Sequence, residues 1–365
     1  MTVDHKLSFE VIPNPQPLPE AERVEAFKAL GFGTLFSDHM AVVRWTEGKG
    51  WHSATIGPRK PFQLDPASAV LHYAQEIFEG LKAYHGTAGD IVLFRPDQNA
   101  ARFNESAKRM GMPELPPEIF LEAIEKLVQI DRKWVPEGGG SLYLRPFMFA
   151  NETFLGVRSS KEYIFCVVAS AVGPYFKGGA KPISIWATQT YTRAAVGGTG
   201  AAKCGGNYAA SLVAQNEAYA NGCDQVVFFD AKEHRWVEEL GGMNIFFVME
   251  DGTLQTPPLG TILPGITRKS LIQIARDQGL TVVEKPYSWE EWQADAASGR
   301  LREAFACGTA AVVAAIGKVK FEGGEFTIGG SQNGPVTTRL REALLGVQHG
   351  TSADPYGWVH TIKAA

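Results

Sequence analysis

Residues 197–208 read GGTGAAKCGGNY and are the most informative stretch of this sequence. Lys203 stands between glycines and alanines, and a loop of such small residues brings its backbone close to a ligand. A lysine there can clamp a phosphate, or can form a Schiff base once desolvation favours its neutral amine. The stretch is not a P-loop, because the GxxxxGK[ST] spacing is absent. A solvated lysine on a surface loop explains the same residues, so both interpretations stay open.

Two turns further along the chain have features of an anion site. Residues 263–267 read LPGIT and precede a predicted helix, whose free N–H groups and positive dipole end attract anions. Gly265 would let a phosphate approach, and the Thr267 hydroxyl can bond an oxygen. Residues 308–310, GTA, form a second turn of this kind. Ordinary helix capping explains either turn taken alone.

Two adjacent acids, Glu238 and Glu239, precede a pair of glycines and an apolar run. Neighbouring residues of a strand face opposite sides, so we expect only one of these acids to point inward. A buried acid needs a partner, and a protonated pyridine nitrogen is a suitable one. The sequence itself does not decide between the two.

The composition is that of a globular protein. Its 365 residues, 45% hydrophobic and 20% charged, are enough for two domains with separate cores. A net charge of -4 supplies no basic surplus for nucleic acid or an anionic membrane. Four cysteines without a CxxC pair suit a reducing compartment. The N-terminus lacks a signal-peptide core, and the longest apolar run falls short of the ~20 residues that span a bilayer. We therefore expect a cytoplasmic protein without bound metal that binds small molecules and other copies of itself.

The order of predicted elements indicates an α+β fold rather than a doubly wound sheet. A cluster of Gly, Pro and Lys at 173–182 is the best boundary candidate. It predicts an N-terminal domain over 1–174, an interdomain loop over 175–182 and a C-terminal domain over 183–365. Helices are expected at 97–110, 117–134, 207–220 and 268–278, and strands at 39–45, 91–94, 163–172, 183–187, 224–230 and 236–250.

Segments along almost the whole chain together resemble the branched-chain amino-acid aminotransferases, a family of fold-type IV pyridoxal-phosphate enzymes. GGNY after a lysine, then E-x-G-x-MNIFF, then LPGITR is a specific combination, although each alone is weak. The resemblance implies a smaller N-terminal α/β domain and a larger, β-barrel-like C-terminal domain with flanking helices. It also implies ping-pong transfer of an amino group between L-leucine, L-isoleucine or L-valine and 2-oxoglutarate. The other matching segments are FGTLFSDHM, LHYAQEIFEGLKAY, LFRPDQNAARF, SLYLRPFMFA, GVRSSKEYIF, GPYFKGG and FACGTA.

The resemblance assigns the contacts to pyridoxal 5'-phosphate. Lys203 would form the Schiff base and move a proton between the substrate Cα and the cofactor C4′. Tyr208 would bond the phenolic oxygen, and Glu239 would keep the pyridine nitrogen protonated, which makes the ring an electron sink. Periodicity does not select Arg102, because it lies off the apolar stripe of its predicted helix, as Arg109 does. A solvated helix face explains both arginines. The phosphate cradle would consist of Arg102, Ile266, Thr267 and Thr309.

The resemblance also assigns the substrate pocket. Arg145 would meet the distal carboxylate of glutamate, while aromatic walls favour apolar side chains. The backbone N–H groups of Thr309 and Ala310 would hold the α-carboxylate. Leu155 and Val157 would reach in from a second subunit, which implies a homodimer. Core packing explains each aromatic residue taken singly. The walls would be Phe32, Tyr73, Phe78, Tyr143 and Tyr175.

Other functions fit parts of the sequence. D-amino-acid aminotransferases and aminodeoxychorismate lyases share the fold and the lysine and acid, but the EGLKAY and YLRPF segments favour the branched-chain family. A binding or regulatory protein could keep the fold without the chemistry. The presence of Lys203, Tyr208 and Glu239 argues against that.

Overall fold

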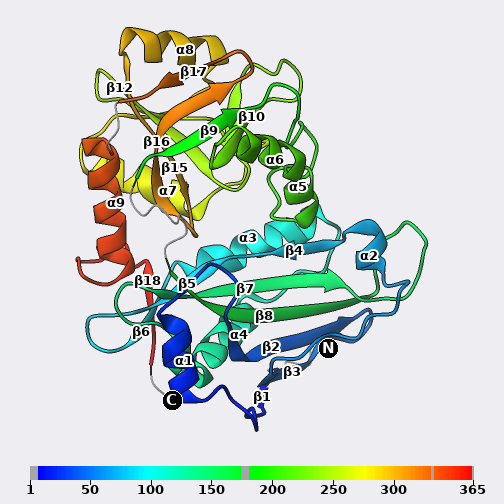
Figure 1. The fold of residues 1–365 in the computed structure, drawn as a ribbon. Coiled ribbons are helices and arrows are strands. Elements are labelled where there is room, and N and C mark those ends of the chain that lie inside the picture. Colours follow the sequence, from blue (N-terminus) through cyan, green and yellow to red (C-terminus); the bar gives the residue numbers. More distant parts are fainter. Residues whose placement is uncertain (1–6, 174–180, 330–332, 364–365) are drawn as a thin grey trace. The chain divides into compact units, whose positions relative to one another are not determined.

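The computed structural model describes residues 7–173, 181–329 and 333–363. By its internal contacts the chain divides into two units, shown as ribbons in Figure 1. Unit 1 comprises Met1–Tyr175 and Val347–Ala365, and unit 2 comprises Phe176–Gly346. Within the described residues, each unit is built on its own nine-stranded sheet with helices packed on it. The α+β fold class predicted from the sequence is confirmed.

Unit 1 rests on a mostly antiparallel sheet. Its strands are β1 (Glu10–Val11), β2 (Phe36–Thr46), β3 (Gly50–Pro58), β4 (Glu76–Phe78), β5 (Leu81–His85), β6 (Ile91–Phe94), β7 (Ser141–Ala150), β8 (Glu162–Val172) and β18 (Val359–Ile362). They follow the order β1-β3-β2-β8-β7-β5-β6-β18, and β4 also pairs with β7. β7 and β8 lie mid-sheet and are buried on both faces, which explains why they are rich in apolar residues.

Helices cover this sheet. They are α1 (Glu20–Phe27), α2 (Ala69–Tyr73), α3 (Pro96–Arg109), α4 (Pro117–Ile130) and the 3-10 turn η1 (Arg132–Trp134). α4 packs on β2, β3 and β8 and against α3. The helix predicted over 97–110 is confirmed, but the one predicted over 117–134 ends at Ile130. The chain turns there into η1, because the buried Trp134 donates its indole N–H to Asp38 at 2.8 Å.

Unit 2 has a mixed sheet that curls in a barrel-like way in Figure 1. Its strands are β9 (Ile183–Ala187), β10 (Gln225–Phe229), β11 (Val237–Leu240), β12 (Asn244–Met249), β13 (Leu254–Thr256), β14 (Val282–Glu284), β15 (Leu301–Gly308), β16 (Val312–Phe321) and β17 (Gly324–Thr327). The order is β11-β10-β9-β16-β15-β12-β13-β14, with β17 on β16. β9 runs parallel to both of its neighbours, while β15 is antiparallel to β12 and β16.

The helices of unit 2 include two where the sequence predicts one. They are α5 (Gly205–Ala209), α6 (Leu212–Ala220), α7 (Ile266–Asp277) and α8 (Trp289–Ser298), and α9 (Pro335–Gln348) leads back to unit 1. The predicted helix 207–220 is broken at residues 210–211. The Ser211 hydroxyl donates to the Tyr208 carbonyl at 2.8 Å and competes for an acceptor that an unbroken helix would use.

The C-terminal strand departs from the predicted domain division. β18 pairs antiparallel with β6, so Val347–Ala365 belong to unit 1 although the sequence assigns them to the C-terminal domain. Unit 1 is therefore the longer unit, whereas the resemblance implies a smaller N-terminal domain. A four-residue strand whose partner lies far away in the chain gives no local signal. Most of the predicted loop 175–182 lies outside the described residues.

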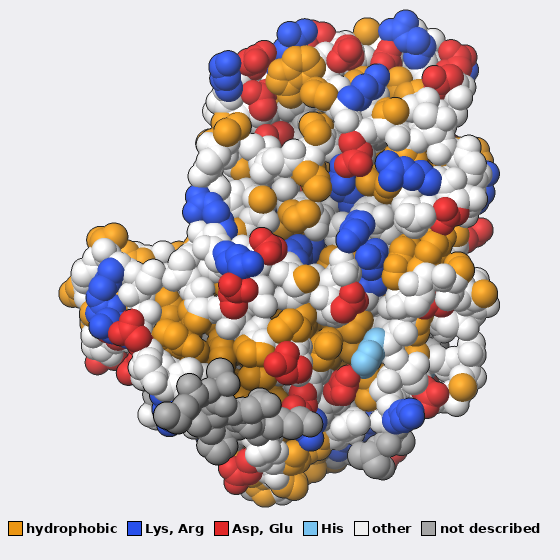
Figure 2. Space-filling view, turned by 180° about the vertical axis from the view of Figure 1, so that it is seen from behind, with side chains coloured by type: hydrophobic (Ala, Val, Ile, Leu, Met, Phe, Trp, Pro, Cys, Tyr) orange, Lys and Arg blue, Asp and Glu red, His pale blue; other side chains and the backbone are white. Residues whose placement is uncertain are grey.

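Charged side chains of both signs are interspersed over the face seen in Figure 2, with hydrophobic side chains gathered between them. The blue Lys and Arg side chains on this face lie among red Asp and Glu side chains. Within the described residues, no helix combines the length and the apolarity needed to cross a bilayer.

Candidate active site

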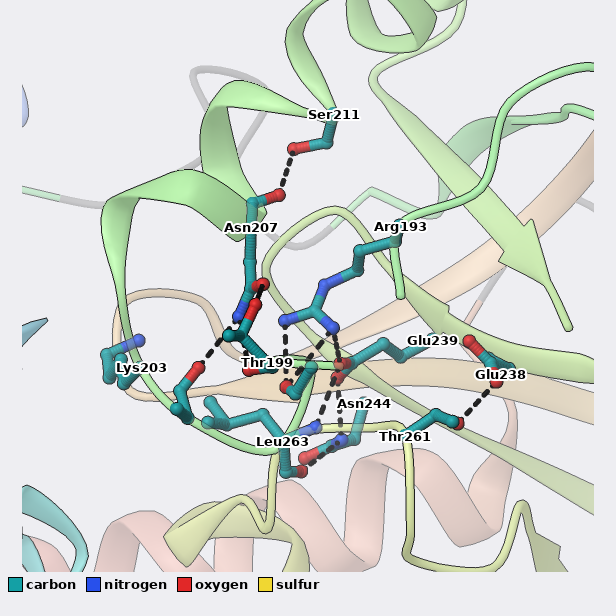
Figure 3. Close-up of polar contacts among 12 residues, drawn as sticks. Arg193, Thr199, Lys203, Asn207, Ser211, Glu238, Glu239, Asn244, Thr261 and Leu263 are labelled. Carbon is teal, nitrogen blue, oxygen red and sulfur yellow. Dashed lines mark hydrogen bonds and ion pairs between the residues drawn. The ribbon is translucent and has the colours of Figure 1, made fainter. Parts of the chain in front are cut away.

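Lys203 lies in the loop that leads into α5. Its Nζ donates to the Tyr208 hydroxyl at 2.7 Å. The loop before it is pinned by Asn207, whose amide donates to the carbonyls of Thr199 and Ala202, each at 2.8 Å (Figure 3). The Thr199 hydroxyl returns a bond to the Asn207 amide oxygen at 2.7 Å. The predicted lysine and phenol are therefore held at hydrogen-bonding distance by a loop of fixed shape.

The Glu239 carboxylate is buried at the end of β11 and held by three donors. Arg193 Nη1 and the Leu263 backbone N–H each lie 2.9 Å from Oε1. The Asn244 amide donates to Oε2 at 3.0 Å, as Figure 3 shows. Burial raises the pKa of Glu239 to about 7, while the charges of Arg193 and Lys203 and the Leu263 N–H act in the opposite direction.

Glu238 is also buried, so the prediction that only one of the two acids points inward is wrong. The Thr261 hydroxyl donates to its Oε1, and within the described residues its buried Oε2 has no hydrogen-bond partner. Burial raises the pKa of Glu238 as well. All four residues of β11 are buried, and the segment through Thr261 and Leu263 supplies a hydrogen-bond partner to each acid. Glu239, the acid that the resemblance assigns to the pyridine nitrogen, is ion-paired with Arg193.

The helix predicted to begin at residue 268, after the first anion turn, begins two residues earlier, inside LPGIT. Ile266 and Thr267 are the first two residues of α7 and are buried. Gly265 is the N-cap of this helix and has no side chain to satisfy the first N–H groups. Glycine is also required at position 265 for space, because a β-carbon there would overlap the Asn244 side-chain oxygen. Thr309 and Ala310 follow β15 and are half-buried.

Arg102 is buried in α3, so the explanation by a solvated helix face is wrong for it, although Arg109 is exposed. Its Nε and Nη2 donate to the two carboxylate oxygens of Glu79 at 2.7 and 2.9 Å. Glu79 is fully buried and also accepts from the Asn99 amide at 2.7 Å and the Gly80 backbone N–H at 3.2 Å. One edge of the Arg102 guanidinium is therefore fixed within unit 1.

Four of the predicted substrate residues lie together in unit 1. Phe32 and Tyr143 meet edge to face, with ring centroids 5.0 Å apart. Arg145 lies over the Phe78 ring at 4.6 Å and donates to the Tyr143 hydroxyl at 3.0 Å. A β-carbon on Gly80 would overlap that hydroxyl, so glycine at this position admits the tyrosine. The buried Arg145 Nε has no partner within the described residues.

Of the remaining predicted substrate residues, Tyr73, Leu155 and Val157 are exposed. Tyr73 donates its hydroxyl to the Leu155 carbonyl, and both residues are exposed. Leu155 is 63% and Val157 90% exposed. Tyr175 lies outside the described residues.

Several polar residues of these networks were not singled out from the sequence. Asn207 and Asn244 stand inside the motifs GGNY and MNIFF, where a polar residue among small or apolar ones is a usable signal. Arg193 and Thr261 follow no recognisable pattern, and Glu79 is one acid of a matching segment. The described residues contain no cluster of three or more His, Cys, Asp or Glu that could hold a metal.

Comparison with known proteins identifies relatives along the whole chain. The family model of the class IV amino-transferases matches residues 76–319. A probable branched-chain-amino-acid aminotransferase of Streptomyces coelicolor is 53% identical over 357 residues, or 97% of this chain and 99% of that protein. The branched-chain-amino-acid aminotransferase of Mycolicibacterium smegmatis is 53% identical over 98% of this chain and 99% of its own. Branched-chain-amino-acid transaminase 1 of Bacillus subtilis is 47% identical over 90% and 93%.

Solved structures share the fold. A T.th. branched-chain amino acid aminotransferase with pyridoxamine 5'-phosphate superposes with a TM-score of 0.73 at 29% identity, covering 88% of this chain and 99% of that one. The Escherichia coli branched-chain amino acid aminotransferase gives a TM-score of 0.74 at 28% identity, covering 88% of this chain and all of the other.

Proposed function

Since this chain belongs to the class IV aminotransferases, we propose that it exchanges an amino group between branched-chain L-amino acids and 2-oxoglutarate. Relatives more than half identical over nearly the full length support the substrate class. A structural neighbour that contains pyridoxamine 5'-phosphate supports pyridoxal 5'-phosphate as the cofactor. The observation that carries the proposal is the Lys203–Tyr208 hydrogen bond, with Lys203 within electrostatic reach of the buried Glu239.

The side chains of unit 2 fit this cofactor. An amine, a phenol and a carboxylate match its aldehyde, its phenolic oxygen and its ring nitrogen. Burial raises the pKa of both Glu238 and Glu239, so a further cation beside Glu239 would stabilise its ionised carboxylate. A protonated ring nitrogen is such a cation. The start of α7, with Ile266 and Thr267, and the turn at Thr309 offer N–H and hydroxyl donors to its phosphate, and we assign Arg102 of unit 1 to the same group.

The bound cofactor supplies an electron-withdrawing ring that makes the Cα–H bond of the amino acid acidic. We propose that Lys203 would hold the bound cofactor through Nζ, and that its amine, once displaced by the incoming amino group of the substrate, would move the proton between the substrate Cα and C4′. Tyr208 restricts rotation of the Lys203 side chain, because its hydroxyl accepts a hydrogen bond from Lys203 Nζ at 2.7 Å. Glu239 keeps the ring nitrogen protonated, and its three donors prevent the carboxylate from turning away.

In unit 1 we assign substrate recognition to the cluster of Phe32, Phe78, Tyr143 and Arg145. The aromatic faces suit apolar side chains of leucine size, and an arginine held against two rings can still accept the distal carboxylate of glutamate. The Arg145 Nε, buried without a partner among the described residues, is a donor for that carboxylate. The backbone N–H groups of Thr309 and Ala310 are assigned to the α-carboxylate.

We also propose that the protein is a homodimer and cytoplasmic. The exposed Leu155 and Val157 lie two residues apart on one loop, where a second subunit could cover them, as the resemblance implies. Tyr73 and Tyr175 are assigned to the same pocket. Four free, buried cysteines support a reducing compartment. We regard units 1 and 2 as the substrate-selecting and cofactor-binding domains.

A panel of amino donors tests the proposal. L-leucine, L-isoleucine, L-valine, L-glutamate and D-alanine are each supplied with a 2-oxo acid acceptor, and formation of the product 2-oxo acid is measured with and without added cofactor. Transfer from the branched-chain donors with parallel double-reciprocal plots is expected. Transfer from D-alanine but not from L-leucine would assign a D-amino-acid aminotransferase. Pyruvate release from aminodeoxychorismate would assign the lyase.

A further inference from the structure

Arg193 connects the acid and the lysine of the candidate site, although the proposed mechanism does not use it. The segment that carries it precedes the loop with Lys203, and its guanidinium lies between that loop and β11 (Figure 3). Its side chain is only 2% exposed, and that of Glu239 is 3% exposed. The Nη1–Oε1 distance of 2.9 Å is that of a charge-assisted hydrogen bond.

The same guanidinium also binds the lysine loop. Nη1 and Nη2 lie 3.3 and 3.4 Å from the carbonyl oxygen of Gly200, three residues before Lys203. Gly200 itself has no room for a side chain, because a β-carbon would overlap the Thr261 carbonyl and the Ala194 side chain. The lysine loop and the segment through Thr261 therefore pack closely beside this guanidinium.

Arg193 acts electrostatically on a second buried acid, Glu238, as well as on Glu239. Glu238 is buried beside Glu239 and receives one hydroxyl bond, from Thr261. Two adjacent buried carboxylates repel each other, and the Arg193 charge stabilises the ionised form of both. The Lys203 charge acts on Glu239 as well, and the Glu239 charge in turn contributes to the raised pKa of the Cys307 thiol. Loss of the guanidinium would leave a buried carboxylate without its ion pair.

We propose that Arg193 is a positioning residue of the transamination, which fixes the Glu239 carboxylate for the pyridine nitrogen and at the same time fixes the loop that carries Lys203. This inference rests on the proposed function and adds a residue to it. Arg193 touches neither substrate nor cofactor in this role, and it acts through Glu239 and the Gly200 carbonyl.

The experiment compares Arg193→Gln and Arg193→Lys with the unchanged enzyme. Glutamine keeps a hydrogen-bond donor but no charge, and lysine keeps the positive charge but not the planar guanidinium with its several donors. The affinity of the apoenzyme for pyridoxal phosphate is measured against pH by tryptophan fluorescence, and kcat is measured against pH with L-leucine. For Arg193→Gln we expect the acid limb of both profiles to move to higher pH by about one unit, with cofactor affinity about tenfold weaker at pH 7. Arg193→Lys should recover part of the shift.

Arg268→Gln is the matched control. Arg268 is also a buried arginine of unit 2, but its ion pair is with Glu284 at 2.7 Å rather than with Glu239. Its loss should lower the melting temperature and leave the acid limb in place. The inference is overturned if Arg193→Gln lowers only stability, as the control does, with both limbs unmoved. It is also overturned if Arg193→Lys shows no recovery. Failure of the unchanged enzyme to transaminate would instead remove the proposed function.

Discussion

The side-chain oxygen of Asn244 occupies the space that a β-carbon on Gly265 would need. Gly265 has φ -63° and ψ 131°, a conformation open to any residue, so glycine is required there for space alone. The Asn244 amide donates to Glu239 at 3.0 Å and to the Leu263 carbonyl at 3.0 Å. This contact joins the acid to the start of α7.

Gly265→Ala should therefore destabilise the protein by about 1–3 kcal/mol, the usual range for overpacking a closed site. In an Asn244→Ala background the space is open, so the same substitution should cost much less. Urea unfolding of the four apoproteins gives the coupling energy between the two positions. An equal cost of Gly265→Ala in both backgrounds would show that the overlap has no energetic effect.

Lys203→Ala should abolish transfer while the fold remains. Removing a group that carries a proton in the reaction lowers rates by about 10²–10⁴-fold, and loss of the covalent attachment adds to this. Lys203 is only partly buried, so the thermal midpoint should change little. Lys232→Ala, at an exposed turn of the same unit, is the control and should retain full activity. Steady-state transfer from L-leucine is the measurement, and activity retained in Lys203→Ala contradicts the assignment.

Tyr208→Phe removes the hydroxyl 2.7 Å from Lys203 Nζ and keeps the ring. A hydrogen bond to a charged group is worth about 1.5–3 kcal/mol, so kcat should fall by roughly one to two orders of magnitude. Tyr219→Phe changes a tyrosine of α6 that is 60% exposed and serves as the control. An unchanged kcat in Tyr208→Phe would show that the phenol does not orient the lysine.

Glu239 should make the apoprotein less stable as pH rises. Its pKa is raised from 4.5 to about 7 by burial, so the folded state binds more protons than the unfolded state between these values. The stabilising effect is present below pH 4.5 and is lost as pH rises towards 7, a change on the order of 3 kcal/mol. Urea unfolding from pH 4.5 to 8 should show this slope in the difference between the unchanged protein and Glu239→Gln. A difference independent of pH contradicts it, and the exposed Glu233→Gln is the control.

Arg145→Met should change substrate preference more than overall activity. The Arg145 guanidinium donates to Tyr143 and stacks on Phe78, so methionine keeps much of the packing but loses the charge. We expect kcat/KM for L-glutamate to fall by about 10–100-fold, and that for L-leucine to change little. The ratio of the two constants is the measurement, with the exposed Arg44→Met as control. A parallel loss for both donors would assign a structural role to Arg145.

The sequence predicts much of the local structure of this protein, because local periodicity and glycine positions carry that information. The strands at 91–94 and 183–187 and the start of α4 agree with the structure. The break at Ser211 escapes prediction because a side-chain bond to the Tyr208 carbonyl overrides helix periodicity. β18 escapes prediction because its partner strand is remote in the chain.

The candidate site also contains residues that the sequence predicts and residues that it does not. Lys203 can be found because a charged residue among glycines is conspicuous, and the tyrosine and acid follow from the resemblance. Burial of both Glu238 and Glu239 depends on what covers each face of β11, which a single strand does not reveal. The Arg193–Glu239 and Arg102–Glu79 pairs depend on tertiary distances between remote segments, and no spacing rule selects them.

The pairing of β18 with β6 has a consequence for how the protein is made. Synthesis on the ribosome proceeds from the N-terminus, so β6 emerges long before the strand that closes its edge. Throughout translation of unit 2, the nascent chain carries an open sheet edge with buried-type residues, the kind of surface that chaperones bind and that aggregates form on. Unit 1 reaches the topology described here only after Val359–Ile362 have been made, so β18 is the strand that completes this edge of the sheet.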